Sequence, residues 1–116
     1  MTANTYRSLV LMSIFAMVST PLFAEVVAAP TAAPQQIATP AKTPEEHQQA
    51  SELHKQHADY HKAMAEHHKS LATEYKNAGN HELHEHHEEL AEHHQKLSKE
   101  HAKTAINHEK AAIKVK

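Results

Sequence analysis

The stretch YKNAGNH, residues 75–81, holds the single glycine of this 116-residue chain. A glycine directly after a helical segment suits the left-handed backbone that ends many helices, and the Asn80 that follows Gly79 can cap a new helix. A helical pattern of apolar residues precedes this stretch, and a second one runs from His81 to about Ile113. The stretch therefore predicts a sharp turn at 77–80 between two helices.

The start of the first helix is marked just as clearly. Thr43 is a good N-cap, Pro44 suits the first helical position, and Glu46 can complete a capping box with Thr43. The periodic pattern then continues to Asn77 without another strong break. Residues 43–116 are thus predicted to form an all-α antiparallel helical hairpin that resembles a coiled coil.

Heptad assignment gives the hairpin a register. Position a holds His47, His54, His61, His68, Tyr75, His87, His94, His101 and His108. Position d holds mainly leucine, methionine and alanine, with His57 and Thr104 as the exceptions. If the chain folds back at Gly79, each a residue faces a d residue whose number brings the sum to 158. In that register His57 and His101 form the one layer with histidine on both sides.

Position e carries small residues in both segments. They are Ser51, Ala58, Ala65, Ala72, Ala91, Ser98, Ala105 and Ala112. Small side chains permit close approach of another surface. A homodimer that forms a four-helix bundle is therefore a possible assembly.

The rest of the chain divides into two segments. Residues 1–24 are typical of a cleavable secretory signal peptide, with Arg7, an apolar run over 9–18 and Ala24 before the cleavage point. Residues 25–42, rich in Ala, Pro and Thr, are predicted to form a flexible linker. These features predict a periplasmic or secreted protein without stable membrane association after cleavage.

Composition excludes several functions. The chain has no cysteine, which rules out disulfides, thiolate metal sites and cysteine nucleophiles. Its net charge of −2 argues against nucleic-acid binding. It contains no HExxH motif and no evident nucleophile–base pair, so we do not expect an enzyme.

Fourteen histidines, all between His47 and His108, are the outstanding feature of the sequence. Neutral imidazole binds Cu(II), Ni(II) and Zn(II), and histidines three or four residues apart share one helix face. The predicted tightest site takes His57 and His101 together with His54 or His61, leaving a fourth position for water. A second predicted site takes His67 and His93. Further candidate ligands are His84, His87 and His94.

Residues 47–108 resemble, in composition and repeat style, the small histidine-rich periplasmic metal-binding proteins of bacteria. The resemblance implies several sites for copper, nickel or zinc and a role in buffering or scavenging metal. The chain differs from that family in its Leu and Met residues at position d, its proline-rich linker and its single hairpin. Two alternatives stay open: an acid-responsive helical protein, and a chaperone-like structural coiled coil.

Overall fold

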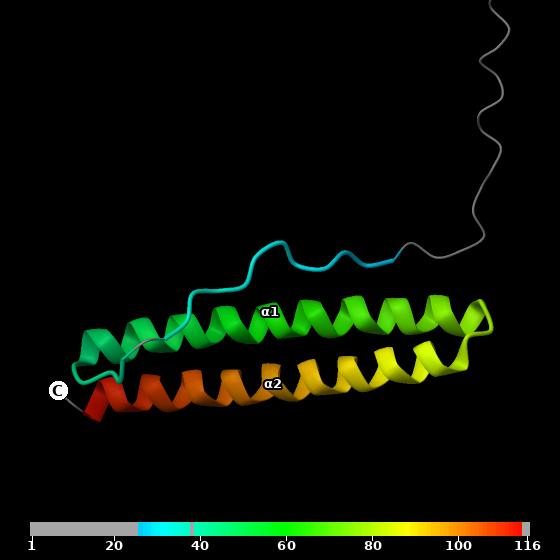
Figure 1. The fold of residues 1–116 in the computed structure, drawn as a ribbon. Helices are drawn as coiled ribbons and strands as arrows, with labels where there is room; N and C mark the ends of the chain where they lie inside the picture. The colour runs from blue at the N-terminus through cyan, green and yellow to red at the C-terminus, as the bar shows by residue number, and fades with distance from the viewer. Residues whose placement is uncertain (1–25, 38, 115–116) are drawn as a thin grey trace, which may run out of the picture.

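The computed structural model describes residues 26–37 and 39–114 of the chain. Its two helices, α1 (Pro44–Asn77) and α2 (His81–Lys114), lie side by side in opposite directions (Figure 1). No strand occurs within the described residues. The predicted all-α antiparallel hairpin is confirmed. The signal peptide predicted at 1–24 lies outside the described residues.

The start of α1 is fixed by the predicted capping box. The hydroxyl of Thr43 accepts a hydrogen bond from the Glu46 amide at 3.1 Å, and the Glu46 carboxylate accepts one from the Thr43 amide at 3.3 Å. The same carboxylate accepts a bond from the Lys42 amide at 2.7 Å. These contacts satisfy amide groups that the first helical turn leaves free.

The turn between the helices also follows the prediction. Gly79 has φ of 81°, the left-handed conformation that glycine adopts without steric cost. The Gly79 amide donates to the Lys76 carbonyl at 3.0 Å and the Asn80 amide to the Tyr75 carbonyl at 2.9 Å, which together form a Schellman motif. The Asn80 side chain then accepts a bond from the Leu83 amide at 3.1 Å and caps α2.

The core between the helices consists of small side chains. The buried residues are Ala50, Ser51, Ala58, Ala65, Ala72, Ala91, Ala105 and Ala112. All but Ala50 occupy heptad position e, which we expected to face another molecule. That expectation is wrong: the hairpin buries these residues itself, because alanine and serine allow the two backbones to approach closely. The small residues at e therefore no longer argue for a homodimer.

Close packing through positions a and e changes the predicted layers. The hydroxyl of Ser98 donates to the Ala58 carbonyl at 2.8 Å, a direct contact between the two e positions. The leucines at d in α2, Leu83, Leu90 and Leu97, are only half-buried. The predicted alternation of a and d residues across the interface is thus incorrect, because the large d side chains sit at the edge of a contact centred on a and e.

Residues 26–37, which we call the N-terminal strap, run along α1 (Figure 1). The Val27 amide donates to the Ser70 hydroxyl at 2.9 Å, and the Gln35 carbonyl contacts His57, which lies nearer the start of α1 than Ser70 does. The strap therefore runs antiparallel to α1. The flexibility expected of residues 25–42 stays a prediction. Among the described residues, neither helix has an apolar stretch long enough to cross a membrane.

Candidate metal centre

Eight histidines at position a meet along the contact between the helices. They form four cross-helix pairs whose Nδ1 atoms lie 2.9 to 3.0 Å apart. The pairs are His47 with His108, His54 with His101, His61 with His94, and His68 with His87. We call these eight residues the histidine ladder. The sequence-based register, which allowed a single layer with two histidines, is wrong on this point.

The ladder is continuous because each pair also stacks on the next. The ring centroids of His61 and His101 are 5.5 Å apart with planes inclined by 8°, and those of His68 and His94 have the same separation and angle. His54 and His108 stack at 5.4 Å. At the turn end, Tyr75 stacks on His87 at 5.3 Å. Rings from α1 and α2 thus alternate along the interface.

Hydrogen-bond chemistry limits how many protons the ladder can hold. An Nδ1···Nδ1 hydrogen bond needs a proton on one ring and a lone pair on the other, so the two neutral rings of a pair must be opposite tautomers. One extra proton on a pair leaves this bond intact. A second extra proton would direct two N–H groups at each other. Each pair therefore accepts at most one extra proton without losing its hydrogen bond.

Burial also opposes protonation of the ladder histidines. It is the largest cause that lowers the pKa of the ladder histidines His54, His61, His68, His87, His94 and His101 below the ordinary value. Neighbouring imidazoles lower these pKa values further; for His61 these are mainly His94 and His101. For His101, the carboxylate of Glu100 partly opposes the shift. The interface thus favours neutral imidazole, the form that binds metal.

Three histidines form a cluster that we call the triad: His57, which is not part of the ladder, and the ladder residues His61 and His101. One ring nitrogen from each lies within 4.8 Å of the other two. Among the described residues, this is the one group of three or more potential ligands found so close together. His57 and His61 are one turn apart on α1, and α2 brings His101 against them, with the rings of His57 and His101 stacked at 4.8 Å.

The triad has a suitable size for a transition metal. Imidazole nitrogens bind Zn at about 2.0–2.1 Å, so tetrahedral ligands lie about 3.3 Å from one another. In this structure the three nitrogens lie within 4.8 Å of one another, so binding would bring each pair closer by at most about 1.5 Å. All three side chains are half-buried, which leaves solvent access for a fourth ligand. His61 and His101 would have to give up their hydrogen bonds to His94 and His54 if Nδ1 were the binding atom.

The remaining candidate ligands are not members of the triad. His54, His87 and His94 belong to the ladder. His67 donates from Nδ1 to the Val27 carbonyl, while His93 is exposed. The second predicted site, His67 with His93, stays a prediction.

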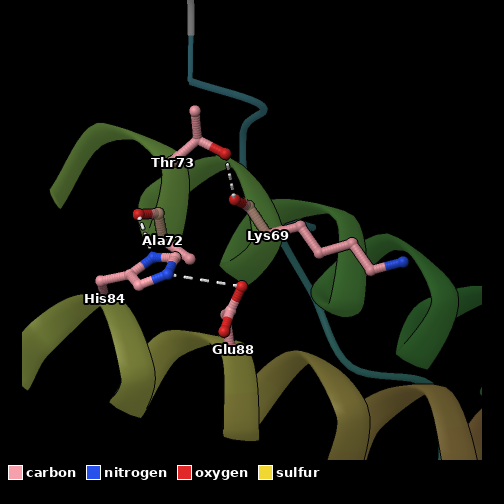
Figure 2. Close-up of polar contacts among 5 residues, drawn as sticks. All are labelled: Lys69, Ala72, Thr73, His84 and Glu88. Carbon is pink, nitrogen blue, oxygen red and sulfur yellow. Dashed lines mark hydrogen bonds and ion pairs between the residues drawn. The ribbon is translucent and has the colours of Figure 1, made fainter. Parts of the chain in front are cut away.

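His84 contacts α1 at the turn end of the hairpin. Its Nδ1 donates to the Ala72 carbonyl at 2.8 Å, and its Nε2 lies 3.5 Å from the Glu88 carboxylate (Figure 2). Lys69 and Thr73 lie near this contact on α1. Both ring nitrogens of His84 therefore face oxygen acceptors.

Sequence reasoning did not find any of the four cross-helix pairs of the ladder. The signal was present, since all eight residues occupy position a, but the assumption that a residues face d residues concealed it. The chain matches no protein-family model, and neither a curated protein nor a solved structure is significantly similar to it. The interpretation of the site therefore rests on its geometry and chemistry.

Proposed function

We propose that this protein is exported from the cytoplasm and binds divalent transition metal, Cu(II), Ni(II) or Zn(II), as a buffer or scavenger. The observation that carries the proposal is the triad. Two helices bring one ring nitrogen each of His57, His61 and His101 to within 4.8 Å of one another. Histidine, without any cysteine in the chain, suits these three metals better than Cu(I).

The coordination chemistry fits reversible binding. Three protein nitrogens leave a fourth position for water or for a ligand that delivers or removes the ion. The site also joins α1 to α2, so bound metal cross-links a hairpin whose core is mainly alanine. A ligand at 100 times its Kd adds about 2.7 kcal/mol to the free energy of unfolding. Metal binding should therefore stabilise the hairpin measurably.

Export is part of the proposal because of the character of residues 1–24. Their single arginine, apolar run and terminal alanine support delivery to the periplasm or the outside of the cell. Those compartments are oxidising and leave few free protein thiols, so a histidine site there meets little competition from thiolate ligands.

Purification and titration test the function. The chain is expressed with its own N-terminal segment, isolated without an affinity tag from the compartment it reaches, and analysed for bound metal. The stripped protein is then titrated with Cu(II), Ni(II) and Zn(II). We expect at least one ion per chain at micromolar affinity or tighter. Binding no tighter than millimolar for all three ions would contradict the proposal.

The ladder favours a second candidate function, an acid-responsive helical protein. Its stacked imidazoles are suited to the neutral state, and their accumulated charge near pH 5 would oppose the contact between α1 and α2. A response to acid that leads to a function, rather than simple loss of stability, would require a partner that distinguishes the two states. The homodimer remains a separate prediction, which sedimentation of the metal-free protein can test.

A further inference from the structure

The N-terminal strap contacts the triad residue His57. The backbone carbonyl of Gln35 lies 2.9 Å from Nε2 of His57. A carbonyl oxygen can only accept a hydrogen bond, so Nε2 of His57 carries the proton. In the neutral ring this leaves the lone pair on Nδ1. The strap therefore selects which nitrogen of His57 is free to bind an ion.

Further contacts hold the strap in place at both of its ends. At its far end the Val27 amide donates to the Ser70 hydroxyl at 2.9 Å, and the Val27 carbonyl accepts from His67. At its near end Ile37 lines a shared cleft with Ala50 and Leu53 of α1. The carbonyl of Gln35 lies between these anchors, so its position over His57 does not depend on one hydrogen bond alone.

We propose that the strap is a positioning element of the metal centre, which holds His57 with Nδ1 as the ligand atom through the Gln35 carbonyl. This inference rests on the proposed function. Histidines that bind metal commonly donate their other N–H to a carbonyl or carboxylate, which fixes the tautomer and ring orientation and makes the ligand nitrogen more basic. The strap supplies this partner from outside the hairpin, and it does so for one of the three ligands.

The same contact gives the strap a role that its composition did not suggest. The prolines at 30 and 34 restrict the backbone, so less conformational freedom is lost when the strap lies along α1. A segment with the composition of a linker can thus contribute to a binding site through its main chain, without a metal-binding side chain of its own.

Two variants of the full chain test the proposal. In the first, residues 26–37 are replaced by a Gly/Ser sequence of equal length. In the second, Ile37→Ser and Ser70→Ala remove one anchor at each end and leave the helix interface unchanged. The control carries Ala32→Ser and Ala33→Ser, two exposed strap positions. Circular dichroism first establishes that all variants keep the helical hairpin.

Two measurements are compared. The nitrogen chemical shifts of His57 in the metal-free protein report its tautomer, and titration with Zn(II) and Cu(II) reports affinity. We expect the unaltered chain and the control to show a single Nε2–H tautomer. Both strap variants should show mixed tautomers and bind metal about 10- to 100-fold more weakly, the usual effect of losing such a partner.

The outcomes separate this inference from the proposed function. Unchanged affinity and unchanged His57 shifts in both strap variants would overturn the inference alone. Tighter binding by the variants would also overturn it, since the strap would then obstruct the site. Absence of metal binding by the unaltered chain would overturn the proposed function, and the positioning role with it, even if the His57 shifts showed that the strap contact exists.

Discussion

His54 and His101 face each other across the hairpin with their Nδ1 atoms 2.9 Å apart. His101 also stacks on His57 and belongs to the triad. One imidazole thus takes part in two arrangements, a hydrogen-bonded pair and a candidate metal centre. His61, paired with His94, is in the same situation. Ligand binding at the triad and hydrogen bonding in the middle of the ladder are therefore coupled.

The triad and the ladder can be separated by two double variants. His57→Ala with His101→Ala removes two of the three ligands, whereas His47→Ala with His108→Ala removes one complete ladder pair and leaves the triad intact. We expect the first variant to lose the tightest site, with affinity reduced on the order of 100-fold, or about 2.7 kcal/mol. It should also lose most of the metal-induced rise in Tm, which calorimetry with and without Zn(II) measures.

The second double variant is the matched control, since it also removes two half-buried histidines from opposite helices. Its metal affinity should stay within a few-fold of that of the unaltered chain. Equal losses in both variants would mean that the histidines bind metal as a diffuse set and that the triad has no special role.

Stability of the metal-free protein should fall in acid. Burial lowers the folded pKa of six ladder histidines, as for His54 and His68, while the unfolded value stays at about 6.5. Between the folded and unfolded values the unfolded chain binds more protons, so the free energy of unfolding rises with pH. This stability is fully present above about pH 6.5 and is lost as pH falls through that value toward the folded pKa values.

Denaturant unfolding followed by circular dichroism, from pH 8 to pH 4 without metal, checks this prediction. The ladder histidines also interact with neighbouring ionisable side chains: His57, His86 and His93 lower the pKa of nearby ladder residues, and Glu100 raises that of His101. The transition should therefore extend over more than one pH unit. An unfolding free energy that does not change between pH 7 and pH 5 would show that the ladder is not held neutral.

Most of the fold could be predicted because its determinants are local. The capping box at Thr43 and Glu46, and the left-handed Gly79, each fix a helix end through neighbouring residues. The layers could not be predicted in the same way. Whether a helix contacts its partner through d or through e depends on how closely the backbones approach, and that distance results from the whole set of alanines and serines acting together.

The candidate site was predictable in part for the same reason. His57 and His61 share a helix face by spacing alone, and the turn at Gly79 places His101 near them in any register close to the observed one. The contact between His57 and Gln35 had no sequence signal, because a backbone carbonyl carries no residue identity. The four Nδ1 pairs required side-chain orientations that heptad positions do not specify.

The pair His68 and His87 offers a test of the ladder hydrogen bonds away from the triad. His68→Leu alone leaves Nδ1 of His87 without its partner and should cost about 1 kcal/mol of unfolding free energy. His87→Leu alone should behave similarly. The double variant replaces both polar groups by apolar ones, so its cost should be smaller than the sum of the two single costs by about 0.5 kcal/mol or more. Strictly additive costs, measured by denaturant unfolding at pH 8, would show that the pair does not interact.

The alanine interface should be the part of the hairpin least tolerant of added volume. Ala91 is 1% exposed between the helices, whereas Ala102 lies on the exposed face of α2. The variants Ala91→Leu and Ala102→Leu each add the same atoms to α2, and replacing alanine by leucine changes helix propensity little. Ala91→Leu must push α1 and α2 apart or force strained rotamers, so we expect a loss of about 1–3 kcal/mol. Ala102→Leu should stay within about 0.5 kcal/mol of the unaltered chain.

Separation of the helices would also lengthen the distance from His101 to His57 and His61, so Ala91→Leu should weaken metal binding while Ala102→Leu should not. Thermal unfolding and Zn(II) titration of both variants measure the two effects. Equal stability of the two leucine variants would mean that the helices are not in the close contact that brings the triad together.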